Sequence, residues 1–251
     1  MNSSAAAHLT NHSDQPIVVT EFPKSGGSWI SSMLGEVLSL PNRDIYVQPG
    51  FDLFDIASHP WYSQADALDI PPQCVVKSHE LPHSSLINFD ATYIHLIRDG
   101  RDVAVSKWFF DQKFCVDNGI RTALPTNFYE YVIKTAAEWS SYVNSWLQQS
   151  VITVRYEDFL AAPVQSLGNL LAQMGYEERP LVTLEACVAK FSKKNFSASF
   201  DKTFKHNTFV RKGIAGDWVN HFNHHHVDGF KSVANDTLLL LEYESTSAWS
   251  I

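Results

Sequence analysis

The sequence predicts an α/β fold, a single domain with a central parallel sheet flanked by helices. Three observations lead to this prediction. Short apolar runs with the length of buried strands recur along the chain, segments with helical spacing of apolar residues alternate with them, and the 251 residues suffice for one full core. Because such strands are apolar on both faces, a sheet built from them needs helices on both sides.

The first elements lie at the N-terminal end of the chain. Residues 1–15 are small and polar, so we expect a flexible segment there and a folded domain over 16–251. The β-branched run at 17–20 predicts the first strand, and a helix is expected over about 28–40, where Pro41-Asn42 would end it. Residues 41–72 are rich in Pro, Asp and aromatic residues and predict a long irregular loop with short helical pieces.

The remaining elements follow the same alternation. Apolar runs predict strands at 74–79, 92–98 and 151–156, a helix is expected from Asp102 onward, and the spacing over 127–149 predicts a long amphipathic helix. Ligands of parallel sheets bind beyond the carboxyl ends of the strands. This rule brings four groups of side chains to one rim: Lys24, the segment Lys77 to His79, Arg98 and Tyr156.

Composition limits the classes of function. The net charge of −8 argues against a general nucleic-acid binder. The three cysteines have no metal-binding or redox spacing and are expected to be reduced and buried. The N-terminus lacks a charged segment followed by an apolar one, and no apolar run approaches the roughly 18 residues of a membrane span. We therefore expect a soluble, cytoplasmic protein without membrane partners.

The segment 22–29 has the features of an anion-binding loop. It joins a strand to a helix, and it contains Pro23, Lys24, Ser25, Gly26, Gly27, Ser28 and Trp29. Backbone N–H groups and the helix dipole would converge there on one anion. The loop is no Walker A motif, because its Lys precedes the glycines. Taken alone, it could also be a purely structural turn.

Two further segments join cations to polar groups. Arg98 ends a predicted strand and Ser106 follows eight residues later on a helix, which suits a terminal phosphate. The alternative is that Arg98 and Arg101 form surface salt bridges with the neighbouring aspartates. Near the C-terminus, Arg211-Lys212-Gly213 and then Gly216-Asp217-Trp218 suggest a loop that closes over an anion.

In this order, the segments resemble the motifs of sulfotransferases that use 3′-phosphoadenosine-5′-phosphosulfate (PAPS). Segment 23–29 is similar to the family's 5′-phosphosulfate loop, 98–106 to its 3′-phosphate motif, and 211–218 to its C-terminal cofactor-closing signature. Lys77-Ser78-His79 is similar to the strand end that bears the catalytic His, and Tyr156 stands where the family places a Tyr near adenine. The resemblance spans about residues 16–245. The loop departs from the pattern at Gly27, where a Thr is common.

The resemblance implies a mechanism and a co-substrate. His79 would be the general base, Lys24 and Lys77 would stabilise the departing 5′-phosphate, and adenosine 3′,5′-bisphosphate would be the product. Arg98, Ser106, Arg211 and Lys212 would hold the 3′-phosphate, and Trp29 and Tyr156 would flank the adenine. No metal would be required, since cationic side chains supply the positive charge. A dimerisation pattern is not recognisable after Trp218, so the oligomeric state stays open.

Other functions are less consistent with these residues. A P-loop-like nucleotide kinase would need a Walker A Lys followed by Ser or Thr and an acidic metal ligand, and neither is present. A non-catalytic nucleotide-binding module would bind the nucleotide without turnover. The histidines at 221 and 224–226 invite a metal site, which their adjacency disfavours.

The acceptor is the least defined part of the prediction. We expect a small-molecule acceptor and sulfation of a hydroxyl more than of an amine, because a neutral His base suits a hydroxyl. Aromatic residues that could line its pocket, but that also suit a core, are Phe51, Phe54, Trp61, Tyr62, Phe110 and Phe114.

Overall fold

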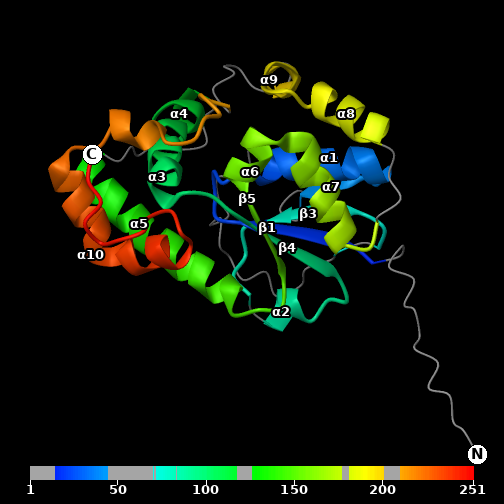
Figure 1. Cartoon of the computed structure of the whole chain (residues 1–251), viewed down its shortest axis with the longest axis horizontal. Helices are drawn as coiled ribbons and strands as arrows, with labels where there is room; N and C mark the ends of the chain where they lie inside the picture. Colours follow the sequence, from blue (N-terminus) through cyan, green and yellow to red (C-terminus); the bar gives the residue numbers. More distant parts are fainter. Residues whose placement is uncertain are drawn as a thin grey trace, which may run out of the picture.

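A parallel sheet at the centre of the molecule carries helices on both sides, as Figure 1 shows for the computed structural model. The structure describes residues 15–44, 70, 72–82, 84–117, 126–176, 181–200 and 210–251. The predicted flexible segment 1–15, apart from Gln15, and the candidate aromatic residues at 51–62 lie outside these ranges.

The described strands pair in the order β2-β3-β1-β4-β5, and every pair is parallel. Their bounds are β1 Ile17–Glu21, β2 Asn42–Asp44, β3 Val75–Ser78, β4 Thr92–Ile97 and β5 Ile152–Arg155. Four of them confirm the predicted strands to within two residues at each end. The fifth, β2, corrects the prediction of an irregular segment over 41–72. Its three polar residues carry no apolar pattern, and pairing with β3 at the sheet edge defines it.

Alternation along β1 divides the interior into two cores. Val18 points into a cluster with α3 (Gly100–Phe109), α5 (Phe128–Leu147) and α10 (His224–Leu240). Ile17 and Val19 point the other way, into a cluster with helices on the opposite face. Those helices are α1 (Gly27–Leu38), α6 (Tyr156–Ala161), α7 (Pro163–Gln173) and α8 (Leu181–Lys190). The predicted fold class, helices on both faces of a parallel sheet, is confirmed.

Local signals explain where the predicted helices begin and end. Asp99 caps α3 by accepting a hydrogen bond from the backbone N–H of Arg101, so the helix starts two residues before Asp102. Asn127 caps α5 in the same way. Ser39 adopts a left-handed conformation with φ 58° and ends α1 before Pro41.

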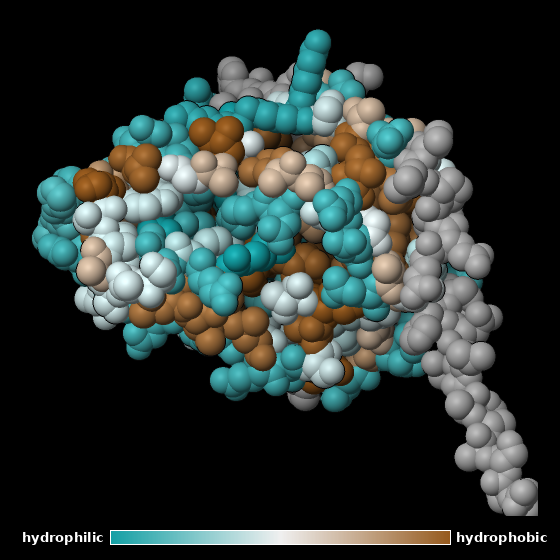
Figure 2. Space-filling model, in the orientation of Figure 1, coloured by the Kyte–Doolittle hydropathy of each residue, from teal (hydrophilic) through white to brown (hydrophobic). Residues whose placement is uncertain are grey.

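Shorter elements complete the described fold. They are α2 (Ser84–Ile87), the π-helix η3 (Phe110–Phe114), α4 (Cys115–Asp117), α9 (Lys193–Phe200) and the 3₁₀-helix η4 (Asp217–Asn220). Hydrophobic and hydrophilic residues are interspersed on the face shown in Figure 2. Within the described residues, none of the helices combines the length and the hydropathy that a membrane crossing requires.

Candidate active site

The carboxyl edge of the sheet opens into a pocket that collects the predicted site residues. Loop 22–29, the ends of β3 and β4, helices α3 and α6, and segment 210–214 all contribute to its lining. The predicted residues that line it are Lys24, Gly26, Gly27, Ser28, Trp29, Lys77, His79, Arg98, Ser106, Tyr156, Arg211, Lys212 and Gly213. Ser25 is buried within the same loop. Five separate segments of sequence therefore meet at one site.

The loop after β1 has a backbone conformation that requires glycine at position 26. Gly26 has φ 106°, and a Cβ built on it would lie 2.6 Å from Cδ2 of Tyr156. Lys24 also adopts a positive φ of 76°, which is uncommon for a residue with a side chain. Helix α1 begins directly after this turn, at Gly27, so its N-terminus faces the pocket.

Lys24 is half-buried within the site, and its pKa reflects that position. Burial lowers the pKa of Lys24 to about 8, and the carboxylate of Glu21 opposes the shift. Its Nζ lies 4.0 Å from the ring centroid of Phe110 in the π-helix η3. At neutral pH the lysine is therefore a partly desolvated cation next to the ring of Phe110.

His79 follows the last residue of β3 and is 3% exposed. Its Nδ1 lies 3.0 Å from the carbonyl oxygen of Glu21. A carbonyl only accepts hydrogen bonds, so the Nδ1 atom carries the proton, and in the neutral ring the lone pair is then on Nε2. Lys77, two residues earlier, pairs with Val19 in the sheet and lines the same pocket.

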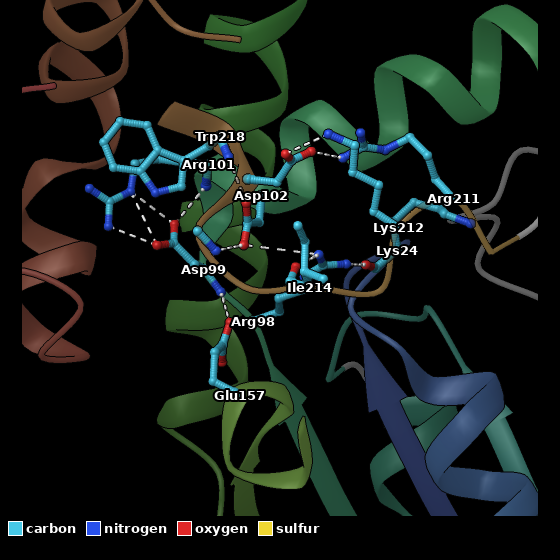
Figure 3. Close-up of polar contacts among 12 residues, drawn as sticks. Lys24, Arg98, Asp99, Arg101, Asp102, Glu157, Arg211, Lys212, Ile214 and Trp218 are labelled. Atoms are coloured by element: carbon cyan, nitrogen blue, oxygen red, sulfur yellow. Dashed lines mark hydrogen bonds and ion pairs between the residues drawn. The ribbon is translucent and has the colours of Figure 1, made fainter. Parts of the chain in front are cut away.

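Arg98 ties three of the predicted motifs together, as Figure 3 shows. Its guanidinium donates to the carbonyl oxygens of Lys24 at 3.0 Å and Ile214 at 3.3 Å. It also lies 4.5 Å from the ring centroid of Tyr156. One side chain at the end of β4 thus positions the anion-binding loop and the C-terminal segment relative to each other.

The ion pairs considered for segment 98–102 do form, but in the interior instead of on the surface. Arg101 lies 2.7 Å from Asp99 and its guanidinium lies over the rings of Trp218 and Trp249. Asp102 is 1% exposed and lies 4.0 Å from Arg98. Arg98 therefore lines the pocket, whereas Arg101 lies outside its lining and supports the fold.

Asp102 anchors the C-terminal segment. Its carboxylate accepts hydrogen bonds from the backbone N–H of Gly216 at 2.7 Å and of Trp218 at 2.9 Å (Figure 3). Burial raises the pKa of Asp102, and Arg98 opposes that shift. The two motifs that the sequence placed 114 or more residues apart are therefore joined by one carboxylate.

Arg211 and Lys212 are ordered by another buried aspartate. Their side chains lie 2.6 Å and 2.8 Å from Asp217, at the start of η4. Burial would raise the pKa of Asp217, but hydrogen bonds from Lys212 and Arg211 outweigh it and hold the pKa well below its usual range. Asp217 therefore stays ionised at neutral pH and keeps both cations at the pocket.

Some polar atoms of the site suit an anion. Among the described residues, Oγ of Ser25, Nε of Arg98 and Nε of Arg211 are buried and have no hydrogen-bond partner. Buried donors of this kind are costly unless a ligand or water satisfies them. Since all three belong to the predicted phosphate-binding segments, the residues present fit a molecule with two anionic groups.

The two aromatic residues predicted to flank an adenine differ in their surroundings. Trp29 is half-buried, lines the pocket and donates from Nε1 to the carbonyl oxygen of Phe191 at 2.8 Å. Tyr156 contacts Gly26 and Arg98, and its ring meets that of Trp29 edge to face at 5.9 Å. Trp29 therefore offers more surface to a ligand than Tyr156 does.

Histidines near the C-terminus have structural contacts. His226 forms a capping box with Asn223 at the start of α10, and His225 stacks on Tyr129 with the ring centroids 3.8 Å apart. Nε2 of His221 lies 3.2 Å from Asp217. These three histidines therefore take part in capping, ring stacking and a polar contact with Asp217.

Sequence reasoning missed three carboxylates of this site. Glu21, the last residue of β1, lies in the pocket beside the loop. Asp102 and Asp217 lie within the predicted motifs, yet their roles as anchors depend on tertiary contacts with backbone and side chains. The only sequence signal for them was the concentration of Asp and Glu next to the basic residues of an acidic chain.

Known proteins are similar to this chain over most of its length. Residues 14–241 match the family model described as the sulfotransferase domain. Sulfotransferase 2B1 of Mus musculus is 26% identical over 257 residues, covering 94% of this chain and 75% of that protein. Sulfotransferase 1E1 of Homo sapiens is 28% identical over 235 residues, covering 82% and 78%.

Solved structures share the fold. Mouse sulfotransferase SULT7A1 complexed with PAP has a TM-score of 0.68 at 17% identity, covering 89% of this chain and 84% of that one. Retinol dehydratase in complex with androsterone and inactive cofactor PAP has a TM-score of 0.65 at 16% identity, covering 89% and 80%.

Proposed function

The chain belongs to the sulfotransferase family, and we propose that its pocket moves the sulfuryl group from PAPS to a hydroxyl of a small-molecule acceptor. One observation carries the assignment. Cationic side chains from loop 22–29, the end of β4 and segment 211–213 line one pocket together with His79. A kinase is not favoured, because the family match and the loop sequence both point to sulfuryl transfer.

His79 is the proposed general base. PAPS, when bound, supplies the sulfuryl group and a phosphate leaving group. The acceptor hydroxyl must lose its proton as its oxygen attacks, and Nε2 of His79 is the atom that would take it. The hydrogen bond from Nδ1 to the Glu21 carbonyl supports this role, because it fixes the ring and its neutral tautomer.

Lys24, Lys77 and the loop N–H groups would stabilise the negative charge that develops on the leaving phosphate. Charge stabilisation of this kind is strongest where water is excluded and the donors are already in place. The partial burial of Lys24 and the strained backbone of the loop support this role.

The opposite end of the pocket would hold the 3′-phosphate and the base. We assign the 3′-phosphate to Arg98, Ser106, Arg211 and Lys212, and the adenine to Trp29 with Tyr156 beside it. The partnerless Nε atoms of Arg98 and Arg211 support this assignment. The cations of an acidic chain are thus concentrated where a polyanionic co-substrate needs them.

The acceptor and the setting of the reaction belong to the same proposal. Phe110 lines the pocket near Lys24 and is a candidate for acceptor contacts, whereas Phe114 stacks behind it with ring centroids 4.7 Å apart. Sulfation of a hydroxyl is proposed ahead of an amine. A cytoplasmic location is proposed as well, to be checked by cell fractionation.

Calorimetry and a transfer assay test the function together. Purified wild type should bind adenosine 3′,5′-bisphosphate and transfer labelled sulfate from PAPS to members of a phenol and alcohol panel. His79→Ala should keep the nucleotide affinity and lose about 10²–10⁴-fold in transfer rate, the usual contribution of a general base. His224→Ala, at an exposed position, is the matched control and should leave both values unchanged.

Each outcome bears on a different part of the proposal. A wild type without affinity for adenosine 3′,5′-bisphosphate would refute the function. Nucleotide binding without transfer to any acceptor tried would favour the non-catalytic module. A fully active His79→Ala variant would refute only the assignment of the base.

A further inference from the structure

Glu21 accepts a hydrogen bond from a backbone N–H group that an anion in this pocket would use. It is the last residue of β1 and 3% exposed. Its Oε2 accepts a hydrogen bond from the backbone N–H of Gly27 at 2.5 Å. Gly27 is the first residue of α1, so this N–H belongs to the helix N-terminus that faces the pocket. A carboxylate oxygen of the protein therefore stands in an anionic position of the site.

The absence of a side chain at position 27 makes this contact possible. A Cβ built on Gly27 would lie 2.4 Å from Cδ and 2.5 Å from Oε1 of Glu21. Real Cβ atoms essentially never approach other atoms so closely. Glu21 and Gly27 are thus a matched pair, in which the carboxylate fills the space next to the bare backbone.

Charged groups surround Glu21 from several elements. Lys77 acts on it from β3, Lys24 from the loop, and Arg98 from the end of β4, while Tyr156 faces it from α6. His79 contacts its backbone carbonyl. Burial raises the pKa of Glu21, and the three cations and the Gly27 N–H oppose that shift without cancelling it. A further negative charge at the site would favour the protonated acid more strongly.

We propose that, in the free protein, a carboxylate oxygen of Glu21 occupies the position that an oxygen of the 5′-phosphosulfate or 5′-phosphate takes in the complex. Binding of that end of the nucleotide is coupled to uptake of one proton by Glu21. This inference rests on the proposed function. The proton comes from solvent, and the neutral carboxylic acid can donate its O–H to an anionic oxygen that replaces it at the Gly27 N–H. Glu21 is then a residue that sets the affinity of the protein for the nucleotide.

The coupling has a definite sign. Where Glu21 is ionised in the free protein, each rise of one pH unit should weaken nucleotide binding, by up to about tenfold for one proton taken up. Where Glu21 is already protonated, this dependence disappears. Lys24, with a pKa of about 8, adds proton uptake of its own. Loss of the Glu21 charge would enlarge that second contribution, because Glu21 raises the pKa of Lys24.

Isothermal titration calorimetry with adenosine 3′,5′-bisphosphate tests the coupling. Titrations at pH 6 and pH 7, each in two buffers of different ionisation enthalpy, give the affinity and the number of protons taken up. Uptake by Lys24, with a pKa of about 8, is small at pH 6. At that pH Glu21→Gln should take up fewer protons than wild type, and its affinity should fall less than that of wild type between pH 6 and pH 7. Glu36→Gln, an exposed glutamate of α1, is the matched control and should behave like wild type.

A double-mutant cycle tests the contact in the absence of ligand. Gly27→Ala should lower the thermal unfolding midpoint because the new Cβ meets Glu21, and the same change in a Glu21→Ala background should cost much less. This cycle reports on the pair even if Glu21→Gln folds poorly.

The outcomes separate the inference from the function on which it rests. Equal affinity and equal proton uptake in wild type and Glu21→Gln would overturn the role of Glu21, although nucleotide binding would still support the proposed function. Additive effects in the cycle would overturn the contact. Absence of binding in every variant would refute the proposed function, and the inference with it.

Discussion

Two buried carboxylates, Glu21 in the lining of the pocket and Asp102 behind it, have different roles. Burial raises the pKa of both, and Arg98 opposes the shift in both cases. Asp102 accepts backbone hydrogen bonds from Gly216 and Trp218, which belong to a distant segment. Glu21 accepts one from Gly27, six residues further along the chain.

The difference lies in what each hydrogen bond does for the molecule. The Asp102 contacts join α3 to the C-terminal segment. Arg98 lines the pocket, and its hydrogen bonds to the carbonyl oxygens of Lys24 and Ile214 fix its position there. The Glu21 contact uses a donor that a bound anion could take over. We therefore expect Asp102 to determine stability and the shape of the 3′ end, and Glu21 to determine affinity at the 5′ end.

Asp102→Ala should have the largest effect on stability. It removes the acceptor of two backbone N–H groups and the carboxylate beside Arg98, in a position that is 1% exposed. We expect a loss of about 3–5 kcal/mol in the free energy of unfolding, measured by urea denaturation. Asp228→Ala, at an exposed position of α10, is the control. A loss below about 1 kcal/mol would break the comparison, because Asp102 would then not be an anchor.

Gly26→Ala tests the rigidity of the 5′ loop and should have the next largest effect. The substitution combines an unfavourable φ of 106° with a contact of 2.6 Å to Tyr156. Gly175→Ala is a matched control, since Gly175 has φ 80° but no atom within 4 Å of the added Cβ. We expect a cost of about 1–2 kcal/mol for Gly175→Ala from backbone strain alone and about 3 kcal/mol for Gly26→Ala. Equal costs would mean that Tyr156 does not constrain the loop.

Asp217→Asn should have the smallest effect on stability and a visible pH dependence. The pKa of Asp217 is depressed in the folded protein, so its contribution is present above the unfolded pKa of about 4 and is lost as the pH falls below it. We expect the variant to be about 1–2 kcal/mol less stable at pH 7, with the gap to wild type closing between about pH 4 and pH 2. A gap that does not change over this range would refute the ion-pair account of Arg211 and Lys212.

The sequence predicted the fold well where apolar residues form runs. The strands at 17–20 and 92–98 and the long helix after Asn127 carry strong periodic signals, and the structure confirms them. Strand β2 consists of Asn, Arg and Asp and exists through its pairing with β3, so no local pattern could indicate it. The π-helix η3 likewise had no signal in its five residues.

The site shows the same division between local and non-local information. The motifs around Lys24, Arg98 and Arg211 were visible as basic residues next to strand ends and glycines, and the structure brings them together. The role of Glu21 depends on a 2.5 Å hydrogen bond between its Oε2 and the backbone N–H of Gly27, six residues away. The role of Asp102 depends on hydrogen bonds from backbone N–H groups more than 100 residues away. Such roles follow from tertiary contacts and are not encoded in a short pattern.

The central claim is that one pocket holds two phosphate groups, one at the Lys24 loop and one between Arg98 and Arg211. Calorimetric titration of wild type with adenosine 3′,5′-bisphosphate and with adenosine 5′-monophosphate tests it most directly, because the two ligands differ only in the 3′-phosphate. We expect the bisphosphate to bind at least tenfold more tightly, as charge-assisted bonds to that phosphate would provide. Equal affinities for the two nucleotides would contradict the two-ended site.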